Sequence, residues 1–228
     1  MLERGIQATL KRIFDVVVSA AALVVLSPLL LVISLLVVLE GHGPVLFRQK
    51  RPGFRGIPFL ALKFRSMVDK RDDQGRHLPD DARITKLGAF LRRTSLDELP
   101  QFWNVLRGDM SMVGPRPLLM QYLDRYTPEQ SRRHLVPPGI TGWTQVNGRN
   151  DLPWEQKFAL DVWYVDHWSL WLDFKILYLT FWKVIKREGI SAAGSASMPE
   201  FMGSGAASGT SQVASTDQGS LELNSREK

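Results

Sequence analysis

The residues whose types and spacing could do chemistry are concentrated between positions 92 and 117. Adjacent carboxylates, Asp97 and Glu98, follow a pair of arginines, and Arg116 lies between two prolines. Phosphoryl transfer needs cations that neutralise phosphate oxygens and a nucleophile aligned with the leaving oxygen. A carboxylate can act as that nucleophile, and a neighbouring carboxylate can hold Mg²⁺, which prefers oxygen ligands. The block therefore favours phosphoryl-transfer chemistry.

Other positions supply the cations that such chemistry needs. Arginine forks match phosphate oxygens in geometry. Each of these cations could instead be a solvated surface charge, and the stretch Ser95-Leu96-Asp97-Glu98 also fits a helix capping box. A structural role for the carboxylates therefore stays open beside the chemical one. The candidate phosphate-binding residues are Lys63, Arg92 (or its neighbour Arg93), Arg116 and Arg149.

An uncharged apolar run extends from Val16 to Leu39 and carries Ser27-Pro28 at its midpoint. As one helix, at about 1.5 Å per residue, it is long enough to cross a hydrocarbon core of about 30 Å. Proline removes a backbone donor and kinks or breaks a helix. Basic residues lie beyond both ends of the run, and they favour the cytoplasmic side of the membrane for each end. The run therefore predicts either a kinked transmembrane helix or a re-entrant helix, in which Ser27 satisfies a carbonyl freed at the break.

Composition narrows the classes of function. The chain has 228 residues and no cysteine, which excludes disulfides, thiolate nucleophiles and cysteine-rich zinc sites. Its net charge is +6, and residues 189–228 hold four acidic and two basic residues, so residues 1–188 carry +8. A basic body beside an apolar anchor suits anionic lipid and phosphorylated ligands. No nucleic-acid-binding motif accompanies the charge, so nucleic acid is not expected as a partner.

The chain divides into three expected regions. Residues 1–40 form a basic amphipathic lead-in and the membrane anchor, and residues 41–188 form the domain that carries the chemistry. Residues 189–228 are rich in Gly, Ala, Ser and Thr and are expected to be disordered, because they can bury little surface. Within the domain we expect a β-hairpin over 45–49 and 59–64, helices over 82–93, 96–106 and 118–125, a turn-rich loop over 136–150, and two helices between 154 and 186.

Five of the seven tryptophans lie between residues 154 and 186. Aromatic rings with a polar edge favour the membrane interface, but they also build cores, and we expect these to divide between the two. The expected fold class is α+β and mainly helical. It combines an N-terminal re-entrant helix–break–helix anchor with a small globular domain that has a β-hairpin and interfacial amphipathic helices.

Several separated motifs come in one order along the chain. In this order and spacing the sequence resembles the small monotopic phosphoglycosyl transferases of the bacterial sugar transferase family, from the anchor to about residue 190. The resemblance favours the re-entrant form of the anchor. The motifs are Ser27-Pro28, Lys63-Phe64-Arg65-Ser66-Met67, Ser95-Leu96-Asp97-Glu98-Leu99-Pro100-Gln101, Gly108-Asp109-Met110-Ser111, Gly114-Pro115-Arg116-Pro117, Pro138-Gly139-Ile140-Thr141-Gly142 and Gln145-Val146-Asn147-Gly148-Arg149.

The resemblance implies an activity and roles for these residues. Such enzymes move a sugar-1-phosphate from a UDP-sugar to a polyprenol (undecaprenyl) phosphate, release UMP and require Mg²⁺. By position, Asp97 would attack the sugar-bearing phosphorus and hold a phosphosugar intermediate, while Glu98 would help hold Mg²⁺ or assist the lipid phosphate. The cations Lys63, Arg92, Arg116 and Arg149 would grip the phosphates. The resemblance leans towards an N-acetylated amino or diamino sugar of the bacillosamine type.

The same resemblance implies a location and partners. The enzyme would be monotopic, on the cytoplasmic face of the bacterial inner membrane, and would open a pathway of glycoconjugate assembly there. An exposed amphipathic surface is compatible with a homodimer. Two other classes stay open: a glycosyltransferase that moves sugar alone and leaves UDP, and a non-catalytic, basic, lipid-binding scaffold.

Overall fold

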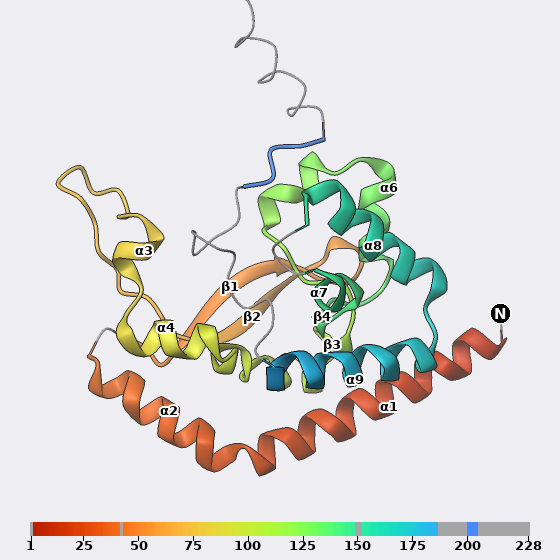
Figure 1. Ribbon diagram of the computed structural model, residues 1–228, viewed down its shortest axis with the longest axis horizontal. Coiled ribbons are helices and arrows are strands. Elements are labelled where there is room, and N and C mark those ends of the chain that lie inside the picture. The colour runs from red at the N-terminus through yellow and green to blue at the C-terminus, as the bar shows by residue number, and fades with distance from the viewer. Residues whose placement is uncertain (1, 42, 149–151, 187–199, 205–228) are drawn as a thin grey trace, which may run out of the picture.

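The computed structural model describes residues 2–41, 43–148, 152–186 and 200–204 (Figure 1). Two helices joined at a bend, α1 (Leu2–Val25) and α2 (Ser27–Leu39), lie along one side of the globular domain. The domain is mainly helical with two small sheets, as the sequence predicts. Its elements are β1 (Leu46–Pro52), η1 (Phe54–Gly56), β2 (Pro58–Phe64), α3 (Asp80–Arg83), α4 (Lys86–Arg93), η2 (Leu96–Glu98), α5 (Gln101–Arg107), β3 (Ser111–Val113), η3 (Met120–Arg125), α6 (Pro128–Ser131), η4 (Arg132–Leu135), β4 (Gly139–Thr141), α7 (Trp143–Asn147), α8 (Trp154–His167) and α9 (Leu170–Lys186).

The anchor bends at the residues that the sequence predicts. Because Pro28 has no N–H, the carbonyl of Val24 loses its helical donor, and the Ser27 hydroxyl donates to that carbonyl at 2.8 Å. The two helices bend by 61°, and together they have the length and composition of a broken span or a re-entrant loop. Within the described ranges no single helix is long and apolar enough to cross a membrane. The break is confirmed, and re-entry into a bilayer stays a prediction.

Large apolar side chains are exposed on three helices that lie along the same side of the molecule, α1, α2 and α9 (Figure 1). Such an apolar surface marks a membrane or protein contact. The aromatics divide between buried and exposed positions, because Trp171 is 78% exposed while Tyr164 is 1% exposed; that the exposed ones lie at a membrane interface stays a prediction. The exposed side chains include Leu10, Ile13 and Val17 on α1, Leu31, Val32 and Leu35 on α2, and Trp171, Tyr178 and Phe181 on α9.

The anchor is joined to the domain by polar contacts as well as by packing. Lys11 forms an ion pair with Asp173 of α9 at 2.6 Å, and the Arg12 guanidinium donates to two carbonyls at the end of α5. Asp15 is 3% exposed and accepts a hydrogen bond from the Met112 backbone N–H at 3.0 Å. Buried polar groups of this kind need partners, so these contacts fix α1 against the domain.

The predicted hairpin is present, and α5 holds its outer edge. Strands β1 and β2 pair antiparallel, with Leu46 opposite Phe64. The Asn104 side chain, 1% exposed, accepts from Leu62 N–H at 3.0 Å and donates to the Leu60 carbonyl at 2.8 Å. One amide thereby pairs the free backbone groups of an edge strand, which otherwise remain unsatisfied. This contact brings β2 against the segment that carries the two carboxylates.

Several predicted boundaries are wrong. The helix expected over 82–93 is two helices, α3 and α4, and that expected over 96–106 is the 3₁₀ turn η2 followed by α5. The helix expected over 118–125 is a 3₁₀ helix, η3. The loop expected over 136–150 contains strand β4, which pairs parallel with β3, and helix α7. The two helices expected between 154 and 186 are confirmed as α8 and α9.

The prediction of a disordered tail is wrong for residues 200–204. Phe201 is 2% exposed and packs among Tyr122, Trp154 and Phe158, with a ring-centroid distance of 4.9 Å to Phe158. Glu200 pairs with Arg125 at 2.7 Å. The composition of the tail, rich in small residues, gives no sign that residues 200–204 are ordered, because the burial of Phe201 depends on aromatic side chains from elsewhere in the chain. The rest of 189–228 lies outside the described residues.

Candidate active site

The two carboxylates lie on η2, a single 3₁₀ turn. Ser95 precedes it with a φ of 57°, in the left-handed region, and its side chain makes no capping hydrogen bond. The capping-box interpretation of Ser95-Leu96-Asp97-Glu98 is therefore wrong. Left-handed backbone is rare for residues other than glycine and is concentrated at functional sites. Neither carboxylate is used to cap a helix.

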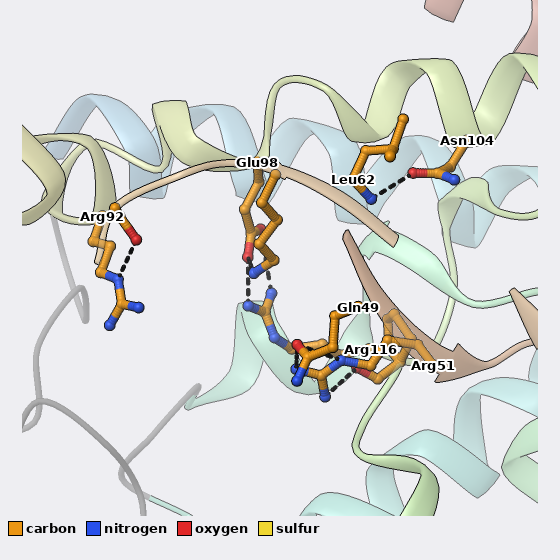
Figure 2. A network of polar contacts seen from close by, with 10 residues as sticks. Gln49, Arg51, Leu62, Arg92, Glu98, Asn104 and Arg116 are labelled. Atoms are coloured by element: carbon orange, nitrogen blue, oxygen red, sulfur yellow. Dashed lines mark hydrogen bonds and ion pairs between the residues drawn. The ribbon is translucent and has the colours of Figure 1, made fainter. Parts of the chain in front are cut away.

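Glu98 is held between two cations from distant parts of the chain (Figure 2). Lys63 of β2 lies 2.7 Å from Glu98 Oε1, and Arg116 lies 2.5 Å from the same oxygen. A second Arg116 nitrogen lies 3.4 Å from Oε2. Burial by itself would raise the pKa of Glu98, but the charges and hydrogen bonds of Arg116 and Lys63 outweigh it and hold that pKa well below its usual range. Glu98 is therefore ionised and fixes both cations.

Asp97 has the opposite environment. It is 7% exposed, and among the described residues no hydrogen bond or ion pair reaches its carboxylate. Burial raises the pKa of Asp97, the neighbouring charge of Glu98 raises it further, and Lys63, Arg116 and Arg92 oppose the rise. A desolvated carboxylate without hydrogen bonds is a stronger nucleophile than a solvated one. Asp97 therefore has the properties of the reacting group, and Glu98 those of its support.

Arg92 reaches the site from α4. Its Nε donates to the Ser66 hydroxyl at 2.9 Å (Figure 2), and it does not contact Glu98 directly. Helix α4 can lie against Ser66 because Gly88 has no side chain: a Cβ there would lie 2.0 Å from the Ser66 carbonyl oxygen. Its Nη2 donates to the Met67 sulfur at 2.8 Å, and Arg92 lines the pocket described below.

A layer of residues behind Arg116 was not predicted from the sequence. Arg133, 2% exposed, pairs with Asp161 at 2.7 Å and donates to the Arg116 carbonyl at 2.7 Å. Arg51 binds the Gln49 side chain at 2.6 Å (Figure 2), and burial together with the Arg116 charge lowers the pKa of Arg51 to about 10. These contacts fix the backbone and surroundings of Arg116. No spacing rule indicates them, because their partners are far apart in the chain.

These groups line one pocket of about 950 Å³. Five of the six predicted phosphate-binding and catalytic residues meet there, whereas the sixth, Arg149, lies outside the described residues. The residues concerned are Lys63, Arg92, Asp97, Glu98 and Arg116. A pocket that gathers several cations around a desolvated carboxylate fits a ligand with more than one phosphate.

The fit of Mg²⁺ depends on the two carboxylates. In the described ranges no group of three or more His, Cys, Asp or Glu side chains could hold a metal ion. The oxygens of Glu98 are already occupied by two cations, whereas those of Asp97 are not. Mg²⁺ commonly takes one or two carboxylates and fills its remaining positions with water and substrate phosphates. The donor set therefore fits an ion bound mainly by Asp97 together with a phosphorylated ligand.

Comparison with known proteins identifies the family. The family profile described as bacterial sugar transferase matches residues 6–187. The chain belongs to this family, and the predictions of the family and of a transferase enzyme are confirmed.

Relatives of known name extend this result. The chain is 54% identical over 196 residues to the uncharacterized sugar transferase EpsL of Bacillus subtilis, covering 86% of this chain and 97% of that protein. It is 46% identical over 189 residues to the UDP-glucose:undecaprenyl-phosphate glucose-1-phosphate transferase of Klebsiella pneumoniae. It is 42% identical over 197 residues to the UDP-galactose-lipid carrier transferase of Erwinia amylovora. The last two alignments cover 78% and 79% of this chain but only 41% of each relative.

Proposed function

We propose that this protein transfers a sugar-1-phosphate from a UDP-sugar to a polyprenol phosphate, such as undecaprenyl phosphate, and releases UMP. The observation that carries the proposal is the contrast between the two carboxylates. Asp97 is buried and has no hydrogen bond from any described side chain or backbone group, while Glu98 beside it holds Lys63 and Arg116 within 2.7 Å. The names of the relatives from Klebsiella and Erwinia support the same class of reaction.

The first step forms a bond from an Asp97 carboxylate oxygen to the sugar-bearing β-phosphorus. The bond from that phosphorus to the bridging oxygen breaks, and the bridging oxygen leaves with its electron pair as part of UMP. In the second step an oxygen of the polyprenol phosphate attacks the same phosphorus, and the Asp97 carboxylate leaves. The product is a polyprenol diphosphate sugar, and Asp97 is regenerated, so atoms and charge balance.

The surrounding residues have distinct roles in these steps. Lys63 and Arg116 offer positive charge to phosphate oxygens in the pocket, and Glu98 keeps both in place. Arg92, held by Ser66, offers a further cation from α4. Asp97 would hold Mg²⁺, with Glu98 adjacent, and the ion would neutralise charge on the diphosphate. Arg149 would complete the phosphate contacts.

The covalent intermediate suits two substrates that differ in solubility. A soluble nucleotide-sugar and a membrane-bound lipid phosphate can use one site in turn. We propose that α1 and α2 enter the cytoplasmic leaflet of the bacterial inner membrane and return to the same side. The exposed apolar side chains of α9 would lie at the interface, which places the pocket near the lipid headgroups.

The donor sugar is a separate question. The sequence motifs resemble those of enzymes that use N-acetylated amino or diamino sugars. The names of the relatives from Klebsiella and Erwinia instead specify glucose and galactose. A hexose pocket discriminates through hydrogen bonds to individual hydroxyl or acetamido groups. The donor panel below therefore includes UDP-glucose, UDP-galactose, UDP-N-acetylglucosamine and UDP-diacetylbacillosamine.

The test is the identity of the released nucleotide. Purified protein is incubated with undecaprenyl phosphate, Mg²⁺ and each UDP-sugar, beside the variants Asp97→Asn and Asp124→Asn. Asp124 is an exposed aspartate of η3 and serves as the matched control. UMP from wild type and Asp124→Asn, with none from Asp97→Asn, is the expected result. UDP would indicate transfer of sugar alone, and no nucleotide from any donor would favour a non-catalytic scaffold.

A further inference from the structure

A buried carboxamide in the pocket has no partner in the part of the chain that the structure describes. Gln145, on α7, lines the pocket and is 9% exposed. Neither its Oε1 nor its Nε2 makes a hydrogen bond with any described residue. Leaving a buried polar group unpaired costs about 1–3 kcal/mol. A side chain kept at this cost is a candidate for binding something outside the chain.

The neighbours of Gln145 do not satisfy it because they are already paired. The Thr144 hydroxyl lies 2.6 Å from Asp161 Oδ1, and the other oxygen of Asp161 accepts from Arg133. The carboxamide is instead placed by packing. A Cβ at Gly142 would lie 2.8 Å from Gln145 Oε1, so the absence of a side chain there leaves room for this orientation. Gln145 is therefore positioned without a hydrogen bond to the described part of the chain.

The pocket divides by chemistry. The part around Glu98 carries the cations that suit a diphosphate. The remaining lining contains further charged side chains, such as Asp69, Arg83 and Lys157, but it also contains a neutral set. Gln145 belongs to this set together with Leu118, Leu119, Tyr122 and Trp154. A nucleotide-sugar has the same division, because its charged diphosphate is flanked by a neutral base and a neutral sugar.

We propose that Gln145 binds the neutral portion of the nucleotide-sugar through a paired contact, donating from Nε2 and accepting at Oε1. The ligand group must offer an acceptor next to a donor. The imide edge of uracil does so, and so do adjacent hydroxyl or acetamido groups of the sugar. This inference rests on the proposed function for the class of ligand, and it makes Gln145 a specificity-determining residue.

The test uses Gln145→Met, which keeps the length of the side chain and removes both polar atoms. Gln156→Met, at an exposed position of α8, is the matched control. Affinities for UDP and for the UDP-sugar that the wild type binds are measured by calorimetry on the full-length protein without polyprenol phosphate. Every protein in this series also carries Asp97→Asn, so that the covalent step cannot occur during the titration. Losing two hydrogen bonds predicts about 10- to 100-fold weaker binding of the UDP-sugar. The control should bind as the wild type does.

The unfolding temperature of Gln145→Met distinguishes a role of Gln145 in ligand binding from a role in folding. Since Gln145 has no hydrogen-bond partner among the residues that the structure describes, Gln145→Met should leave the unfolding temperature unchanged or raise it. Weaker binding of UDP as well as UDP-sugar would identify the base as the group bound. Weaker binding of the UDP-sugar alone would identify the sugar. Unchanged affinity for both ligands, or a loss of affinity that accompanies a lower unfolding temperature, would overturn the inference.

The same measurements are independent of the proposed reaction. Because binding is measured without acceptor and, with Asp97→Asn present, without the covalent step, binding of a UDP-sugar would still test Gln145 even if the wild type never released UMP, a result that would refute the proposed function. A wild type that binds neither UDP nor any UDP-sugar would refute both. Where turnover occurs, Gln145→Met should raise KM for the donor and leave KM for polyprenol phosphate unchanged.

Discussion

Gly88→Ala should damage both the stability and the activity of this protein. The new Cβ would lie 2.0 Å from the Ser66 carbonyl oxygen and 2.8 Å from the Ser66 Cα, whereas ordinary contacts begin at 3.4 Å. Helix α4 must therefore move away from Ser66 by more than about 1 Å. Overpacking of this kind costs about 1–3 kcal/mol, which corresponds to about 2–4 °C in unfolding temperature per kcal/mol.

The same displacement should reach the active site. Arg92 lies one turn beyond Gly88 on α4, and its partner is the Ser66 side chain. A misplacement of about 1 Å can reduce a rate by about 100-fold, so UMP release should fall by about 10- to 100-fold. Thermal unfolding and UMP release are measured beside Gly5→Ala, an exposed helical glycine with nothing within 4 Å of the added Cβ. Wild-type behaviour of Gly88→Ala, or equal damage in Gly5→Ala, would refute the packing argument.

Three further predictions concern stability and topology. Burial lowers the pKa of His134 to about 4. Between pH 6.5 and 4 the unfolded chain therefore binds a proton that the folded chain does not, so acidification over this range should lower the free energy of unfolding by about 3 kcal/mol. The His134→Gln variant should not show this loss. Asn104→Ala leaves backbone groups of β2 unpaired and should lower the free energy of unfolding by about 1–3 kcal/mol in denaturant titration; no change would exclude the amide as the link to β2. Replacing Ser27-Pro28 with Ala-Leu should straighten the anchor, and cysteine labelling from both sides of the membrane should then show its ends on opposite faces, whereas an unchanged topology would exclude the break as the determinant.

Much of the site could be predicted because its residues belong to ordered motifs. Lys63, Glu98 and Arg116 meet in the structure as the resemblance implies. Sequence spacing alone could not fix that meeting, since Lys63 and Arg116 are 35 and 18 residues from Glu98. Their approach depends on a hairpin, a 3₁₀ turn and a loop that pack together. The break at Ser27-Pro28 was predictable from local chemistry, because a proline acts on a carbonyl four residues before it.

The failures arise where tertiary contacts decide the conformation. Ser95 fits a capping pattern, but its left-handed backbone turns the carboxylates into the pocket instead. The pairing of β4 with β3 gives strand geometry to a stretch rich in glycine and proline. Phe201 is buried by an aromatic cluster that forms only in the folded chain. The support of Arg116 by Arg133 and Asp161 is likewise invisible in the sequence, because neither residue stands in a recognisable pattern.

In the proposed reaction the phosphosugar passes through Asp97. The most direct measurement is the intact mass of the protein after incubation with the donor UDP-sugar and Mg²⁺ in the absence of polyprenol phosphate. Transfer through Asp97 predicts UMP release of about one equivalent and a mass increase of one phosphosugar, located on the peptide that contains Asp97 and absent in Asp97→Asn. UMP release that occurs only when polyprenol phosphate is present, with no mass increase at any time, would contradict it.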